Sequence, residues 1–380
     1  MVTTIGTVVV TQLLGSLLSP EALLGALAGG AFGAALGALP AFIIMGFVII
    51  GGEAANLAGR ALAQAGAGDP STLGSLGITG TVAFGPPFSP AISFAGGAAA
   101  TAYAADRGYM QSGFDFHNAK HIPYALGTKP DVLAVGAAFG VLGYWFQTFF
   151  GTLNFPFDGI AMGVTLSALV HRLVFGYDII GDTQGYGLLD MSPFENEEMR
   201  VMGEAATDGG EDQETATDGG ANSNRFLVEP WLPHQYKWPN VATTGLAVGL
   251  LGAFITVQTG SVFLMFGISA ASLVFLNCGI ENVPVTHHMA LVGSAAAAAV
   301  TADGSGLIAG GAALAILMGG LFGLIAGLFG ELFQRIFYSH GDTHWDPPAA
   351  AIAFGSFLIA VLAILGIFPG SSYVPTLGLL

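Results

Sequence analysis

Two adjacent histidines, His287 and His288, stand at the start of an apolar, alanine-rich stretch with the sequence PVTHHMALVG. Imidazole can bind a metal ion, transfer protons near neutral pH or sense pH. Neighbouring residues on a helix point about 100° apart, so these two rings do not readily share one metal ion. Three interpretations remain open. Both rings lie at a membrane surface, or one of them gates a substrate pathway or senses pH there while the other faces the headgroups, or the histidines belong to a metal site.

A second histidine-rich segment, HGDTHWDPP, alternates imidazole and carboxylate groups, which are common metal ligands. The candidate ligands in this segment are His340, Asp342 and His344. The spacing is not a known zinc pattern, and Asp346 before Pro347 is typical of a helix N-cap followed by proline. We therefore expect no cofactor, with a bound metal ion as the alternative.

The composition indicates what kind of secondary structure carries these groups. The chain has 380 residues, of which 53% are hydrophobic and 9% charged, and its mean hydropathy is +0.69. An ordinary soluble domain carries about 25% charged residues. Apolar runs of roughly 20 residues, enough to cross a ~30 Å hydrocarbon layer, recur along the chain. These features predict an all-α integral membrane protein, and the net charge of −16 argues against a nucleic-acid partner.

Ten segments are predicted to span the bilayer. They are 22–39, 41–58, 89–105, 131–150, 158–177, 240–259, 261–279, 286–302, 308–336 and 347–368. Residues 1–20 are too short to cross comfortably and lack the features of a cleaved signal peptide, so an interfacial helix is expected there. Residues 371–380 form a C-terminal tail. The single cysteine, Cys278, is expected to be a small buried packing residue.

A hydrophilic linker over 178–239 separates the fifth span from the sixth. It holds 13 of the 25 acidic residues and includes the micro-repeat ATDGGEDQETATDGG, so it is expected to be disordered. Lysine is scarce in the whole chain. An acidic, lysine-poor surface resembles the composition of proteins from halophilic archaea.

The linker divides two similar halves, a first membrane repeat over 21–177 and a second over 240–370. PFSPAISFAGG lies over PVTHHMALVGS, and FQTFF lies over FQRIF in the same order. Because each half has five spans, the second would enter the membrane from the opposite side. The predicted architecture is therefore about ten transmembrane helices in two five-helix halves related as an inverted repeat.

Orientation follows from the basic residues, which are enriched in cytoplasmic loops. The predicted loops on one side contain nearly all of them, namely Arg107, Lys120, Lys129, Arg335 and the basic residues of the linker. The other side has only Arg60. We expect a cell-membrane protein with a cytoplasmic linker and both termini outside.

Several polar residues at matching places in the halves are candidates for lining a substrate pathway, together with His287 and His288. They are Ser89 with Thr286, Gln147 with Gln334, and Glu53 with Asn277 and Glu281. Ser89 and Thr286 are predicted N-caps, whose hydroxyls would bond the first backbone amides of their helices. The alternative is interfacial capping for the serine, threonine, asparagine and glutamates, and a hydrogen bond across the pseudo-two-fold axis for the two glutamines.

These patterns favour a transporter or channel for a small solute or ion, with its site between the two repeats. The alternatives are a membrane scaffold or a subunit of a larger complex, and an intramembrane metalloenzyme. No nucleotide-binding or hydrolase motif is present in the sequence, and we expect no enzymatic activity. The 58 glycines favour close helix packing, in the bilayer and between copies in a homo-oligomer.

Overall fold

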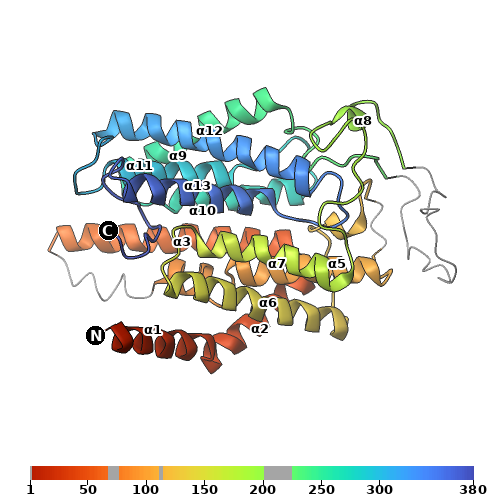
Figure 1. Cartoon of the computed structure of the whole chain (residues 1–380), viewed down its shortest axis with the longest axis horizontal. Coiled ribbons are helices and arrows are strands. Elements are labelled where there is room, and N and C mark those ends of the chain that lie inside the picture. Colours follow the sequence, from red (N-terminus) through yellow and green to blue (C-terminus); the bar gives the residue numbers. More distant parts are fainter. Residues whose placement is uncertain (1, 67–76, 111–113, 201–224) are drawn as a thin grey trace.

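Helices make up the fold of this chain. The computed structural model describes residues 2–66, 77–110, 114–200 and 225–380. Within them the only β pairing is an isolated bridge between Met199 and Phe226. The helices run roughly parallel to one another along the long axis of the molecule (Figure 1).

The N-terminal half contains α1 (Val2–Leu17), α2 (Pro20–Leu36), α3 (Ala38–Gln64), α5 (Ala95–Asp106), α6 (Pro130–Thr152) and α7 (Gly159–Phe175). Three short elements join them: η1 (Thr79–Ala83), η2 (Pro90–Phe94), which leads directly into α5, and η3 (Asn118–Lys120). Helix α2 packs on α5 and α6, and α6 packs on α7. At the α2–α6 contact the backbones meet so closely that a Cβ at Gly30 would lie 2.1 Å from the carbonyl oxygen of Gly136.

The C-terminal half contains α9 (Trp238–Thr259), α10 (Leu264–Asn277), α11 (His287–Val300), α12 (Ala312–Phe337) and α13 (Pro347–Ile364). Its contacts follow the same plan, because α9 packs on α11 and α12, and α12 packs on α13. The first and fourth helices of the half again meet through glycine: a Cβ at Gly323 would lie 2.4 Å from the carbonyl oxygen of Gly245.

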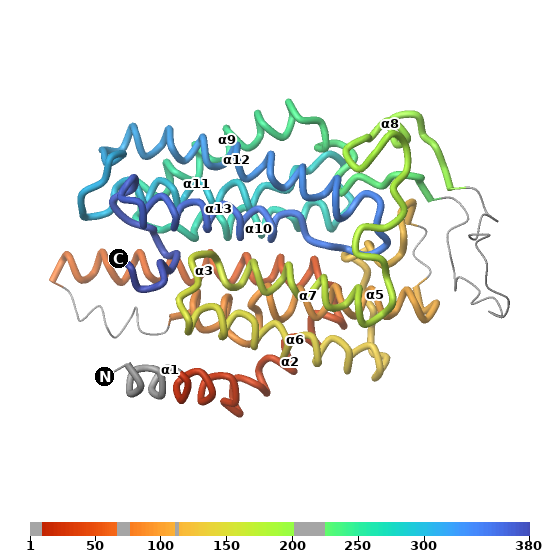
Figure 2. The backbone as a smooth tube through the Cα atoms, in the orientation of Figure 1, coloured from red at the N-terminus to blue at the C-terminus, as the bar shows by residue number. Residues whose placement is uncertain are grey.

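The two halves lie side by side, with the green-to-blue helices above the red-to-yellow ones (Figure 2). Two helix pairs join them, α3 with α10 and α7 with α13. Both pairs are antiparallel. In α3, Gly46 lies against Ala271 while Arg60, farther along, donates to the carbonyl of Thr259 at 3.1 Å.

Helices α7 and α13 are also antiparallel, as two hydrogen bonds between them show. The backbone N–H of Asp158 donates to Ser356 Oγ at 2.8 Å, whereas Arg172, one helix length later, donates to Thr343 Oγ1 just before α13 begins.

Every predicted span coincides with a helix, and α12 is continuous. Five helices are long and apolar enough to cross a membrane: α3, α6, α9, α12 and α13. A sixth span results if the last part of α1 and α2, which meet at a 47° bend, count as one. Helices α7, α10 and α11 are apolar but shorter. The apolar helices are consistent with a membrane protein.

Both termini lie at one end of the molecule, here called the tail end, and α8 (Ser192–Glu195) lies at the opposite, linker end (Figure 1). The prediction of disorder is wrong for the linker flanks, because 178–200 and 225–237 form turns, α8 and the bridge to Phe226. The micro-repeat falls outside the described residues. The prediction for Cys278 is also wrong, because its side chain is exposed in the turn after α10.

Candidate functional site

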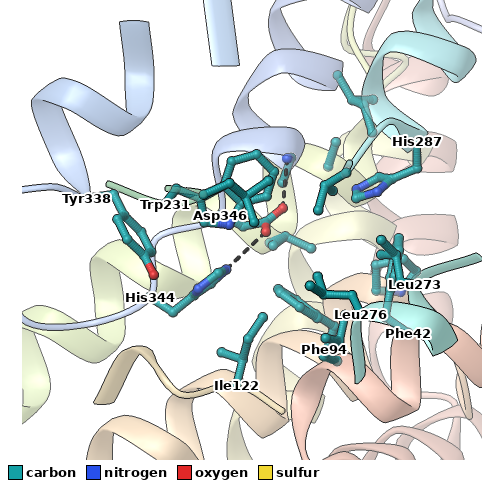
Figure 3. A pocket seen from close by; sticks show the side chains of 18 of the residues that line it. Phe42, Phe94, Ile122, Trp231, Leu273, Leu276, His287, Tyr338, His344 and Asp346 are labelled. Carbon is teal, nitrogen blue, oxygen red and sulfur yellow. Dashed lines mark hydrogen bonds and ion pairs between the residues drawn. The ribbon is translucent and has the colours of Figure 1, made fainter. Parts of the chain in front are cut away.

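A cavity of about 930 Å³ lies between the two halves. Its lining is predominantly apolar and aromatic, with Phe42 and Phe94 from the N-terminal half, Leu273 from the C-terminal half and Trp231 from the linker flank (Figure 3). The lining also reaches both ends of the molecule, from Glu281 at the linker end to residues of the C-terminal tail. The two halves thus form a predominantly apolar cavity that extends toward both ends of the molecule.

Two aspartates cap the helices that meet across this cavity, and sequence reasoning identified only one of them. Asp346 caps α13 as predicted, with Oδ2 accepting from the Ala349 N–H at 2.8 Å. Asp158 caps α7 in the same way, with Oδ1 accepting from the Ala161 N–H at 2.9 Å. Both aspartates and both alanines line the cavity. The available signal was that the predicted fifth span, 158–177, begins with an aspartate, a residue favoured at helix N-caps.

The second oxygen of each aspartate accepts a hydrogen bond from another cavity-lining side chain. Asp346 Oδ1 lies 3.1 Å from His344 Nε2, and Asp158 Oδ2 accepts from the Tyr373 hydroxyl at 2.9 Å. Tyr373 belongs to the C-terminal tail, so the tail closes the cavity at that end. The two capped helix starts are therefore built alike although they belong to different halves.

The adjacent histidines have separate surroundings. His287 lines the cavity, where its ring lies 4.7 Å from that of Phe42, centroid to centroid. His288 points away from the cavity toward Trp231 and Glu331 beside a space of about 10 Å³. Both side chains are buried within the protein, at 6% and 2% exposure, so neither ring faces lipid headgroups. The helix periodicity did separate the two rings as expected.

Ser89 and Thr286 precede η2 and α11, as predicted, but neither hydroxyl caps its own helix. Ser89 Oγ donates to Gln147 Oε1 at 2.5 Å, and Thr286 Oγ1 pairs with Ser269 Oγ at 2.5 Å. The capping prediction is wrong because each hydroxyl finds a partner on a neighbouring helix. Neither side chain is among the cavity lining.

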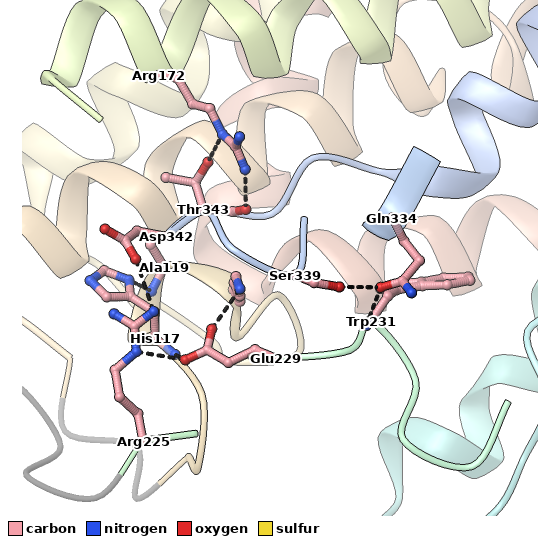
Figure 4. Close-up of polar contacts among 11 residues, drawn as sticks. His117, Ala119, Arg172, Arg225, Glu229, Trp231, Gln334, Ser339, Asp342 and Thr343 are labelled. Carbon is pink, nitrogen blue, oxygen red and sulfur yellow. Dashed lines mark hydrogen bonds and ion pairs between the residues drawn. The ribbon is translucent and has the colours of Figure 1, made fainter. Parts of the chain in front are cut away.

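The repeat-equivalent glutamines also differ. Gln147 lines the cavity. Gln334 is buried elsewhere and connects three segments, accepting from the Trp231 N–H at 3.1 Å and the Ser339 hydroxyl at 2.7 Å and donating to Glu331 (Figure 4). Glu331 also pairs with Arg335, as their i,i+4 spacing predicts.

The remaining pathway candidates lie at the two ends. Glu53 is buried near the tail end and accepts from Thr79 at 2.7 Å and Ser261 at 2.5 Å. Asn277 and Glu281 lie at the linker end, and of these only Glu281 is at the cavity rim. The structure therefore brings His287, Gln147 and Glu281 to one cavity and leaves the other candidates outside it.

The three candidate metal ligands bind to different partners. Asp342 forms an ion pair with Arg225 at 2.9 Å, His344 bonds Asp346, and His340 Nδ1 accepts from the Gln184 N–H at 3.3 Å. Within the described ranges, no three His, Cys, Asp or Glu side chains are grouped as metal ligands would be.

A buried ion-pair cluster at the linker end was not predicted. Lys120 Nζ lies 2.5 Å from Glu229 Oε2, and both side chains are fully buried. Arg225 joins them at 2.6 Å and continues to Asp342 (Figure 4). Burial lowers the pKa of Lys120 to about 8 despite the Glu229 charge. Burial raises the pKa of Glu229, but Lys120 and Arg225 more than offset this and lower it below its ordinary value. Arg225 and Glu229 are four residues apart, but Lys120 and Asp342 are more than 100 residues from either, so only the fold reveals the cluster.

Comparison with known proteins gives a family. A family model described as a family of unknown function (DUF7973) matches residues 12–377, nearly the whole chain. The chain belongs to this family. The match covers both halves, the cavity and the tail residue Tyr373, so all of these elements belong to the DUF7973 region. No curated protein and no solved structure matches the chain.

Proposed function

We propose that this DUF7973 protein is a multi-pass membrane transporter or channel whose substrate site is the cavity between its two halves. The observation that carries the proposal is the cavity itself, lined by both halves and reaching toward both ends of the molecule. Ligand sites of this size, mostly apolar with a few polar groups, are typical of small-molecule recognition. A scaffold has no need of such a space at its centre.

The helix contacts support an inverted repeat of five plus five helices. A two-fold axis in the membrane plane requires that equivalent helices meet in antiparallel orientation where the halves join. The second helices of the halves, α3 and α10, and the fifth helices, α7 and α13, are the two antiparallel pairs at this junction. The shared packing plan within each half adds to this support. All ten helices would then lie in the membrane, with the shorter ones surrounded by the longer.

The proposed orientation places the linker end in the cytoplasm. The buried cluster of Lys120, Arg225 and Glu229 lies at that end, as do Arg172 and Arg335. Their concentration there agrees with the enrichment of basic residues on the cytoplasmic side.

The test is uptake into proteoliposomes by variants that fill the cavity. Ala161 and Ala349 are the third residues of α7 and α13, and both line the cavity. Phenylalanine at either position would occupy the space without removing a polar contact. The matched control is Ala138→Phe, on the exposed face of α6. A panel of ions and small organic solutes is offered, and the wild type is expected to take up at least one.

A transporter or channel loses uptake in Ala161→Phe and Ala349→Phe, measured per folded protein, and keeps it in Ala138→Phe. If the wild type moves no solute of the panel, or if both cavity variants move one at the wild-type rate, the proposal is wrong. A scaffold would leave every variant inactive but folded.

A further inference from the structure

We infer that the cavity binds an uncharged organic solute with an aromatic or apolar body and one hydrogen-bond acceptor, rather than an inorganic ion. This inference rests on the proposed function, because it names the substrate class of the same cavity. It is argued from the charges that face the cavity, from its lining and from His287.

The charged groups inside the cavity already have partners in the protein. Asp158 and Asp346 accept from helix amides and from Tyr373 and His344. Lys120 is paired with Glu229 at 2.5 Å. The two other lining acids, Asp115 and Glu281, are exposed at the linker end. An anion in the interior would therefore meet no unpaired cation, and a cation would meet only the carboxylates of Asp158 and Asp346, whose oxygens already accept hydrogen bonds from helix amides and side chains.

Burying an uncompensated charge costs several kcal/mol, far more than a neutral polar group that finds a hydrogen bond. Aromatic faces attract cations, but such contacts are worth only about 0.5–2 kcal/mol. The rings of Phe42, Phe94 and Phe266 therefore do not repay the dehydration of an ion. They do provide apolar surface for an uncharged ring or chain, and a space of about 930 Å³ is far larger than a bare ion needs.

His287 supplies the polar contact. Its Nδ1 is buried and has no hydrogen-bond partner among the described residues. An unpaired buried lone pair is more tolerable than an unpaired N–H, which assigns the ring proton to Nε2. The ring packs against Phe42 and Phe266. It projects from the first turn of α11 into the cavity (Figure 3). Nε2–H then has no acceptor in the part of the chain that the structure describes, and a carbonyl or amide oxygen of the solute would accept from it.

The test compares three probes of nearly equal size and shape that differ in charge. They are neutral benzamide, cationic benzylammonium and anionic benzoate. Each is offered to the full chain in lipid nanodiscs, with NaCl and KCl as ionic competitors and protein-free nanodiscs as the partition control. Binding is measured by equilibrium dialysis and by quenching of Trp231, which lines the cavity. A Trp231→Phe variant shows which part of the quenching comes from this residue.

Benzamide is expected to bind at least about tenfold more tightly than either charged analogue, with no competition from the salts. His287→Phe keeps an aromatic ring but removes the donor, so it should weaken benzamide about tenfold. The neighbouring His288→Phe, outside the cavity, should leave binding unchanged. Ala349→Phe should abolish benzamide binding. Because this variant leaves His287 in place, it tests the cavity even if His287→Phe fails to fold.

Tighter binding of a charged analogue, competition by the salts, no binding of any probe, or equal benzamide affinity in His287→Phe would each overturn the inference. A co-purified lipid that benzamide does not displace would also overturn it. The outcome for the proposed function is separate. Uptake of an inorganic ion would support the proposed transport function but contradict an uncharged organic substrate. Binding of benzamide without uptake of any solute would contradict the transport function.

Discussion

Gly46 of α3 and Gly267 of α10 face each other where the two halves join, and a Cβ at Gly267 would lie 3.2 Å from the carbonyl oxygen of Gly46. A Cβ at Gly46 would lie 2.6 Å from the backbone nitrogen of Ala271. Each glycine stands ten residues before an asparagine of its own helix, Asn56 in α3 and Asn277 in α10. The two helices therefore approach each other closely where each of them has a glycine.

Gly46→Ala is expected to destabilise the protein by about 1–3 kcal/mol, because the new methyl group overlaps backbone that cannot move away easily. Gly51→Ala is the matched control on the same helix, since a Cβ there would have no neighbour within 4 Å. The control should be neutral or stabilised by up to about 1 kcal/mol, through helix propensity. Thermal unfolding in detergent measures both. Equal effects at the two positions would show that the α3–α10 contact is not tight.

Glu229→Gln is expected to destabilise the protein by about 3–5 kcal/mol, because it leaves Lys120 charged and buried without its partner. Asp342→Asn removes a carboxylate at the partly exposed edge of the same cluster and should cost about 1 kcal/mol or less. Unfolding midpoints of the two variants are compared. If the order is reversed, the buried pair does not hold the linker flank in place.

The same cluster predicts sensitivity to acid. Burial raises the pKa of Asp342, but His117 and Arg225 more than offset it, so its pKa, like that of Glu229, lies below the ordinary value. A carboxylate with a lowered folded pKa adds stability that is fully present above its unfolded pKa and is lost as the pH falls. Stability should therefore decrease below about pH 4.5, the ordinary value for glutamate. Asp342→Asn should show a shallower decrease, and an unchanged slope would contradict its role.

The linker should tolerate a large deletion. Residues 200 and 225 are already adjacent, because the Arg200 N–H donates to the Arg225 carbonyl at 2.9 Å. Deleting 203–222 leaves four residues between these two, which is a common hairpin-loop length. Size-exclusion chromatography and thermal unfolding should match the wild type. Arg225→Ala in the full chain removes the anchor to Glu229 and should be the less stable of the two.

Cys278 allows the orientation to be tested without removing background thiols, since it is the only cysteine and is exposed. With the linker end in the cytoplasm, an impermeant maleimide should label it in inverted vesicles and not in intact cells. Leu379→Cys in a Cys278→Ser background moves the thiol to the tail end, where the side chain is 63% exposed. Its labelling should show the opposite preference. Labelling of Cys278 in intact cells would show that the linker end lies outside, opposite to the proposed orientation.

The sequence by itself determined the helices, their order and the polar ends of several of them. Apolar runs of about 20 residues leave a chain little choice but to form helices, because backbone groups must bond within the segment when no water is available. The predicted spans therefore coincide with the helices. The Asp346 cap and the Glu331–Arg335 pair were also predictable, because both depend on residues within one turn of each other.

Only the tertiary structure decided which polar groups face the cavity. Periodicity placed His287 and His288 on different sides of α11, but Phe42 on a distant helix is what puts His287 in the cavity. Ser89 had the sequence of a cap, yet its hydroxyl bonds Gln147, 58 residues away. Lys120 and Glu229, which form an ion pair, are 109 residues apart in the sequence. Local rules fix groups whose partners lie within a turn, whereas long-range partners depend on how the two halves pack together.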